Sequence, residues 1–324
     1  MLRLEAGGFI ASIVVEVKPA LTPQEASDLL RGFGRALRSI SSGTALLIVA
    51  PWLSARTREI LAREGINYID LTGNARVRLD NPALFIETVG SSRNPEPEKR
   101  GGARVRGPKA ARLIRLLLDV RPPYGVGEIA EATGLAPGYV SRLLDTLYRE
   151  ALIERPARGA IEDVDVPGLI QRWATSYDVL RSNAPMSFIA PAGRSVLLRE
   201  LANYPSEAPR FALTGSTAAS RLAPIAAPAL LLAYCDAPES LAKELGLLPA
   251  EEGADVVFLK PYDPVVWRGN STADGLRFAA PSQVAVDCLT GNGRMPAEGE
   301  ALLGWMRDNE SDWRLPAIGR WDEW

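Results

Sequence analysis

The sequence of 324 residues contains no histidine and only two cysteines. The absence of histidine excludes catalytic triads and general bases built on imidazole, and also zinc sites with a histidine ligand. Cys235 and Cys288 lie 53 positions apart, which fits neither metal-ligand spacing nor a disulfide framework in a chain of this length. We therefore expect two buried, reduced thiols, no metal and no other cofactor.

Long apolar stretches are also missing. The longest, from Leu222 to Cys235, is interrupted by Pro224 and Pro228. The chain begins with ten residues that include an acid, Glu5, instead of the apolar segment of a signal peptide. We accordingly expect a cytoplasmic protein without a membrane span.

The formal charge of -2 conceals an uneven distribution of charge. Residues 1–98 carry 11 basic and 11 acidic residues, residues 99–158 carry 12 and 6, and residues 159–324 carry 14 and 22. A basic segment between a neutral and an acidic one indicates that the middle of the chain binds nucleic acid. Residues 91–108 are rich in proline, glycine, serine and charged residues, a composition typical of a flexible tether.

The sequence predicts an α/β multidomain protein with four segments. These are an N-terminal α/β domain (1–92), a basic linker (93–108), a winged helix-turn-helix domain (109–168) and a C-terminal α/β domain (169–324). In the first segment the hydrophobic pattern and the turn residues predict four strands and two helices. They are strand 8–17, a helix with Thr22 as N-cap, strand 45–50, helix 54–64, strand 66–70 and, after the turn 71–74, strand 75–79.

The middle segment has the spacing of a helix-turn-helix. A short helix from Arg112 to Val120 precedes a second at residue 126, in which Ala130 is small where two helices cross and Gly134 follows where the turn needs a positive φ. Pro137 starts the next helix. The apolar seam consists of Ile129, Leu135, Val140, Leu143 and Leu147. The alternation of apolar and polar residues over 151–164 predicts a hairpin, which completes a winged helix.

In such a domain the second helix of the motif, 137–150 here, enters the major groove of duplex DNA. We expect base and phosphate contacts from this helix and from the hairpin tip, while the basic linker follows the DNA backbone. Arg142 is the best candidate for reading a base. The predicted DNA-binding residues are Lys99, Arg100, Arg104, Arg106, Lys109, Gly138, Tyr139, Ser141, Arg142, Arg155 and Arg158.

Two segments resemble parts of catalytic sites. Glu16 and Lys18, at the end of a strand, match half of a Mg²⁺-dependent nuclease site, but the preceding strand offers only Glu5 and Asp70 has no lysine two positions on. The N-terminal domain is therefore predicted to be restriction-endonuclease-like and inactive.

The second such segment, 211–220, combines a strand, a Gly-Ser turn and a helix, as nucleotidyltransferases do. The next strand ends in the single acid Asp236, where those enzymes need a pair. The C-terminal domain is predicted to be a degenerate nucleotidyltransferase-like fold.

Four stretches resemble the AbiEi-like antitoxins of type IV toxin-antitoxin systems and related bacterial winged-helix regulators. They are 65–74 (GINYIDLTGN), 133–144 (TGLAPGYVSRLL), 213–218 (LTGSTA) and 281–290 (PSQVAVDCLT). The resemblance implies a DNA-binding winged helix followed by a larger C-terminal domain, and repression of the protein's own promoter.

Together these features predict a transcriptional regulator without enzymatic activity. It would bind double-stranded DNA as a homodimer, with the C-terminal domain mediating dimerisation or contact with a toxin or another protein. Two alternatives stay open: a Mg²⁺-dependent nuclease that uses Glu16 and Lys18, and a winged helix that docks protein instead of DNA.

Overall fold

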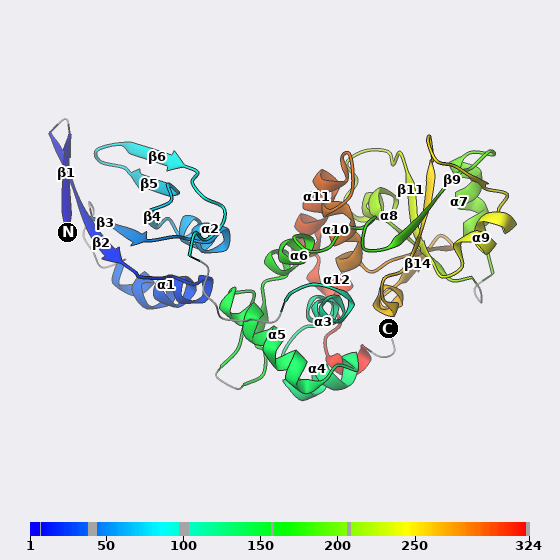
Figure 1. Ribbon diagram of the computed structural model, residues 1–324, viewed down its shortest axis with the longest axis horizontal. Helices are drawn as coiled ribbons and strands as arrows, with labels where there is room; N and C mark the ends of the chain where they lie inside the picture. Colours follow the sequence, from blue (N-terminus) through cyan, green and yellow to red (C-terminus); the bar gives the residue numbers. More distant parts are fainter. Residues whose placement is uncertain (7, 38–43, 97–103, 157–158, 206–208, 322–324) are drawn as a thin grey trace. The chain divides into compact units, whose positions relative to one another are not determined.

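The structure is a computed structural model that describes residues 1–6, 8–37, 44–96, 104–156, 159–205 and 209–321 (Figure 1). The chain forms two compact units. One consists of residues 1–102 and 144–152, and the other of residues 103–143 and 153–324.

The first unit contains a six-stranded sheet in which the strands lie side by side in sequence order. Strands β2 to β4 run parallel, and the sheet ends in antiparallel pairs, β1 with β2 on one side and β5 with β4 and β6 on the other. The elements are β1 (Leu2–Ala6), β2 (Phe9–Val17), α1 (Pro23–Leu37), β3 (Thr44–Ala50), α2 (Ala55–Arg63), β4 (Asn67–Asp70), β5 (Ala75–Leu79) and β6 (Leu84–Thr88). The predicted elements of this unit are confirmed, whereas β1 and β6 were not predicted.

Both helices of this unit begin where their capping residues predict. The hydroxyl of Thr22 accepts a hydrogen bond from the amide of Glu25 at 3.2 Å, and the Glu25 carboxylate accepts one from the Thr22 amide at 2.8 Å, which forms a capping box. Ser54 caps α2 in the same way through the amide of Thr57. These contacts satisfy amide groups that a helix leaves without partners in its first turn.

The turn between β4 and β5 is organised by the buried carboxylate of Asp70. It accepts hydrogen bonds from the amides of Leu53, Thr72 and Asn74, from the Thr72 hydroxyl at 2.7 Å and from the Asn74 side chain at 2.8 Å. Burial acts to raise the pKa of Asp70, but these hydrogen bonds outweigh it and hold the pKa below its usual value. The Asp-Leu-Thr-Gly-Asn sequence is therefore accounted for by its structural role in this turn.

Replacing Asp70 by asparagine should lower the free energy of unfolding by about 1–3 kcal/mol at pH 7, because buried donors would lose a charged acceptor. The stabilisation by a carboxylate of lowered pKa is complete above its unfolded pKa of about 3.9 and is lost as the pH falls through the folded value. Urea unfolding of the full chain should thus show a smaller difference between wild type and Asp70→Asn at pH 3 than at pH 7. Asp80→Asn, at an exposed side chain, is the control. Equal effects of the two substitutions at pH 7 would contradict this role.

The second unit contains a seven-stranded mixed sheet in the order β12-β9-β13-β11-β10-β15-β14. Its strands are β9 (Ala184–Ile189), β10 (Phe211–Thr214), β11 (Leu231–Cys235), β12 (Leu248–Pro249), β13 (Val256–Lys260), β14 (Ser271–Ala273) and β15 (Leu276–Phe278). Its helices outside the helix-turn-helix are α6 (Val166–Ala174), α7 (Arg194–Ala202), α8 (Gly215–Leu222), α9 (Pro238–Glu244), α10 (Pro281–Leu289), α11 (Met295–Asp308) and α12 (Glu310–Trp313), with the 3-10 turns η1 (Pro264–Trp267) and η2 (Ile318–Arg320).

Helices flank this sheet on both sides: α8, α10 and α11 gather on one face, while α7 and α9 lie on the other (Figure 1). The inner strands β10, β11 and β13 are almost entirely buried and apolar, as expected for strands covered on both faces. Cys235 and Cys288 are both buried and free, which confirms the prediction for them. Among the described residues no helix is long and apolar enough to cross a membrane.

The predicted strand, Gly-Ser turn and helix at 211–220 are present as β10 and α8. Gly215 has a φ of +59°, a left-handed conformation that favours glycine, and a Cβ there would make a tight contact of 3.0 Å with Met295 Cε. The hydroxyl of Ser216 donates to the Glu298 carboxylate at 2.5 Å. Asp236 accepts hydrogen bonds from the amide and guanidinium of Arg210. These contacts give the turn a structural role, and the nucleotidyltransferase-like fold stays a prediction.

Candidate nucleic-acid interface

Three helices and a small hairpin form the winged helix-turn-helix. They are α3 (Pro108–Asp119), α4 (Val126–Thr133), α5 (Pro137–Arg149) and the strands β7 (Ile153–Glu154) and β8 (Asp163–Val164). The strands pair antiparallel, and Ile161 adds a bridge to Tyr124 before α4. The apolar seam is confirmed by burial, since each of its five residues is at most 6% exposed: Ile129, Leu135, Val140, Leu143 and Leu147.

Helix α3 begins four residues earlier than predicted. Gly107 has a φ of +80° and is the N-cap, and Pro108 occupies the first turn, where its fixed φ suits a helix and its missing N–H costs nothing. The part of the predicted linker next to it also has defined contacts: Val105 is 3% exposed, and its carbonyl accepts a hydrogen bond from the Ser176 hydroxyl at 2.6 Å. The predicted helix is therefore present, but its predicted start at Arg112 was wrong because the prediction overlooked this Gly-Pro pair.

The tight turn between α4 and α5 depends on Gly134, as predicted. Its φ of +65° is left-handed, and its amide donates to the last turn of α4. We expect Gly134→Ala to destabilise α4 by about 1–2 kcal/mol, the cost of a left-handed alanine. Gly127→Ala should instead stabilise it by about 0.5–1 kcal/mol, because Gly127 lies within the helix and a Cβ there meets open space. Hydrogen exchange of peptides from α4 in the full chain measures both. Similar effects of the two substitutions would rule out this account of the turn.

A network of arginines fixes α3 to the rest of the second unit. Arg112 forms a bidentate ion pair with Asp263, at 2.6 and 3.2 Å. The guanidinium of Arg115 is completely buried and pairs with Asp119 at 2.9 Å. It also donates to the side chain of Gln283 at 3.2 Å and to the Arg268 carbonyl at 2.9 Å. The helix-turn-helix is thus built onto the C-terminal sheet and helices through α3.

The start of α3 and the start of α5 together line a groove, which we call the basic groove. Its lining residues are Arg104, Arg106, Gly107, Pro108, Lys109, Tyr139 and Arg142. Four of these seven residues are cationic and exposed, and none is acidic. Tyr139 is half-buried, and burial raises its pKa. A concave surface with cations and one aromatic ring suits a phosphate backbone beside a recognition helix.

The first turn of α3 adds to the positive potential of the basic groove. Its N-cap, Gly107, has no side chain to accept hydrogen bonds from the first amides of the helix, and the first turn carries no acidic residue. The amides at the N-terminus of a helix bind anions such as phosphate. This element was missed at the sequence level, although the Gly-Pro pair before an apolar helix was a usable signal.

The other predicted DNA-binding residues lie elsewhere. Gly138 is exposed and Ser141 half-buried on α5, next to groove residues but outside its lining. A Cβ on Gly138 would lie 3.7 Å from a guanidinium nitrogen of Arg142, so the two side-chain positions adjoin. Arg155 is half-buried just after β7. Lys99, Arg100 and Arg158 lie outside the described residues.

The residues considered for a nuclease site form an ion pair with each other. Lys18 Nζ lies 2.7 Å from Glu16 Oε1, and the two side chains are about one-third and one-quarter exposed. Within the described parts of the chain, no group of three or more Cys, Asp or Glu side chains has an arrangement that could hold a metal ion.

Comparison with known proteins identifies one domain. Residues 109–157 match the IclR helix-turn-helix domain, a stretch that includes most of α3 and all of α4, α5 and β7. No curated protein and no solved structure matches the chain. The match supports a bacterial winged-helix, DNA-binding transcriptional regulator, in agreement with the prediction made for this segment. The nuclease-like and nucleotidyltransferase-like folds and the AbiEi-like resemblance stay predictions.

Proposed function

We propose that the protein is a sequence-specific regulator that binds duplex DNA through the basic groove and reads the major groove with α5. The observation that carries this proposal is the convergence of Arg104, Arg106 and Lys109 with Tyr139 and Arg142 on one concave surface. Arg104 and Arg106 lie in the segment just before α3, Lys109 lies in its first turn, and Tyr139 and Arg142 lie on the recognition helix of the matched motif. Cations on the flank would hold the backbone, and α5 would contact base edges.

We further propose that it acts as a repressor and as a homodimer. A single recognition helix reads too few base pairs for useful specificity, so two copies on two half-sites would be required. The C-terminal part of the chain would supply the contact between copies, or a contact with a toxin if the protein is an antitoxin. Co-purification with the product of the neighbouring gene would test the antitoxin role.

Arg142 is the proposed base-reading residue. Duplexes selected from a randomised library by the wild-type protein should share a motif, and Arg142→Ala should lose about 5- to 150-fold in affinity for it while binding scrambled duplex almost unchanged. Arg149→Ala, at an exposed arginine near the other end of α5, is the matched control. A similar loss on selected and scrambled duplex would show that Arg142 contacts only phosphate.

A further inference from the structure

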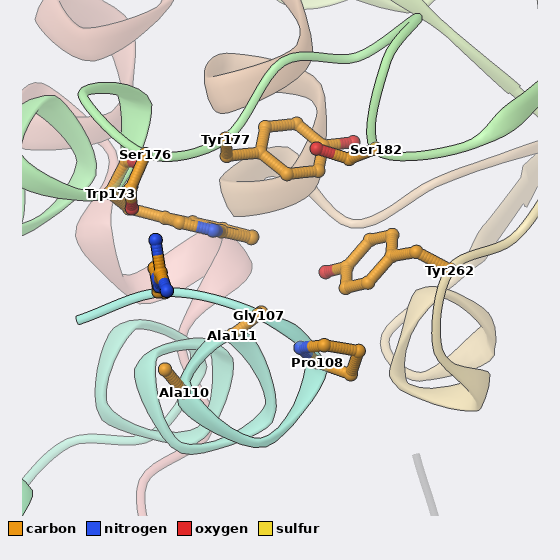
Figure 2. Close-up of a pocket in the computed structure, with 10 residues that line it drawn as sticks. Gly107, Pro108, Ala110, Ala111, Trp173, Ser176, Tyr177, Ser182 and Tyr262 are labelled. Atoms are coloured by element: carbon orange, nitrogen blue, oxygen red, sulfur yellow. The ribbon is translucent and has the colours of Figure 1, made fainter. Parts of the chain in front are cut away.

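A second depression lies beside the basic groove and shares residues with it. This pocket has a volume of about 190 Å³ and is shown in Figure 2. Arg106, Gly107 and Pro108 line both the pocket and the groove. The remaining walls come mainly from the end of α6 and the turn that follows it, and from Tyr262, just before η1. Occupancy of the pocket would therefore affect the segment that begins α3.

Three aromatic rings form the walls of the pocket. The ring centroids of Trp173 and Tyr177 are 5.4 Å apart, and those of Tyr177 and Tyr262 are also 5.4 Å apart. Figure 2 shows the hydroxyl of Tyr262 pointing into the space between the indole of Trp173 and the chain at Gly107. Such walls favour a flat, apolar body. The volume is below the range of about 300–1,000 Å³ usual for ligand pockets, so the ligand must be small.

The wall formed by Tyr177 is held in place by buried polar contacts. Its hydroxyl donates to Asp287 at 2.8 Å and accepts a hydrogen bond from the Asn183 amide at 3.0 Å. Tyr234 also donates to Asp287. Because these partners are all buried, the ring keeps one orientation, as a preformed ligand site requires.

The polar groups of the pocket that have no charged or hydrogen-bonding partner among the described residues are donors. The indole N–H of Trp173 donates to none of the described residues, and it is not among the buried polar atoms that lack a partner. This N–H is therefore accessible at the pocket that Trp173 lines. The guanidinium of Arg106 is exposed and forms no ion pair with any described residue. The uncapped N-terminus of α3 lies at the same wall. No carboxylate lines the pocket, so its free hydrogen-bonding capacity is for an anion.

We propose that this pocket binds a small aromatic carboxylate, with its ring against Trp173 and Tyr262 and its carboxylate on the Trp173 N–H and Arg106. Aromatic cages elsewhere take quaternary ammonium groups, but here Arg106 and the N-terminus of α3 repel a cation. Given the DNA-binding function proposed above, a bound carboxylate engages Arg106 and withdraws one cation from the basic groove. The ligand thereby weakens DNA binding, and DNA weakens ligand binding by the same factor.

Calorimetry on the full chain without DNA tests the ligand site directly. The probes are benzoate, phenylacetate and indole-3-carboxylate, with benzyltrimethylammonium as the cationic counterpart. At least one carboxylate should bind saturably, and Trp173→Phe and Arg106→Gln should each weaken it about tenfold or more through the loss of a charge-assisted hydrogen bond. Arg104→Gln alters the groove but not the pocket, so the affinity for the carboxylate should stay within about twofold of the wild-type value. The proposal fails if no carboxylate binds, if only the cation binds, or if Arg106→Gln has no effect.

DNA titrations with and without the carboxylate that binds test the coupling. The ligand should weaken duplex binding by the wild-type protein about tenfold, roughly the contribution of one phosphate contact at 0.1 M salt. It should have little effect on Arg106→Gln. If the wild-type protein bound DNA equally well with and without the ligand, the proposed coupling would be contradicted. The calorimetric titration is done without DNA, so its result does not depend on the proposed function. If the protein failed to bind DNA, the proposed function would be contradicted, whereas the ligand site would still be supported by the calorimetry.

Discussion

Replacing Arg104, Arg106 and Lys109 together by glutamine should lower the affinity for duplex DNA about 100- to 1,000-fold at 0.1 M salt. All three side chains line the basic groove and are exposed, so their loss should leave the fold intact. Each cation that neutralises a phosphate releases about 0.9 counterion, and three of them should change the slope of log K against log salt by about three. Fluorescence anisotropy with a labelled duplex between 50 and 300 mM salt measures both quantities.

The matched control removes three positive charges elsewhere in the same unit. Arg181, Arg199 and Lys260 are exposed and do not line the groove. Their replacement by glutamine should change affinity only by about threefold, since screening limits charge effects beyond about 10 Å. Equal losses in the two triple variants would show that net charge, and not the basic groove, determines binding.

Arg115→Met should lower the free energy of unfolding by about 3–5 kcal/mol, the largest effect expected of a single substitution in this chain. Arg115 and Asp119 are both fully buried, and the guanidinium also holds Gln283 and the Arg268 carbonyl. Burial raises the pKa of Asp119, and Arg115 is the main charge that opposes it. Without Arg115 the carboxyl would take up a proton or remain as an uncompensated buried charge. Urea unfolding of the full chain measures the loss.

Two further variants show whether the effect comes from the buried charge. Lys109→Met, on the exposed side of the same helix, should change stability by less than about 0.5 kcal/mol. Adding Asp119→Asn to Arg115→Met should recover part of the loss, because the unpaired charge is removed. A loss below about 1 kcal/mol for Arg115→Met would mean that this pair does not anchor α3.

The helix-turn-helix was predictable because its signals are local. The left-handed turn at Gly134, the start of α5 at Pro137 and the buried seam follow from residues within one or two helical turns of each other. The same holds for the capping box at Thr22. Strand β6 was missed because four of its five residues are exposed, so it lacks the alternation of a half-buried strand.

The sequence could not predict which cations of the middle segment are available to DNA, because this depends on contacts with residues distant along the chain. Arg112 and Arg115 contribute to the positive charge of residues 99–158, yet Arg112 is paired with Asp263 and Arg115 is buried. Asp263 is far from Arg112 along the chain, and the guanidinium of Arg115, besides its pair with Asp119 on the same helix, donates to the distant Gln283 and Arg268. The formal charge of that segment therefore overstates its charge available to DNA, whereas Arg104, Arg106 and Lys109 remain exposed. The aromatic pocket likewise joins residues separated by more than 80 positions, such as Trp173 and Tyr262.

The most direct test of duplex DNA binding is the equilibrium titration of the full chain against a labelled duplex of about 30 base pairs from upstream of its own coding sequence, with a scrambled duplex beside it. We predict saturable binding at 50 mM salt and a salt slope near -3.6, corresponding to the four cations of the basic groove. If the upstream duplex contains the operator, it should bind about 1,000-fold more tightly than the scrambled one. No binding to either duplex at up to about 100 µM protein, where non-specific binding is already expected, would contradict the account.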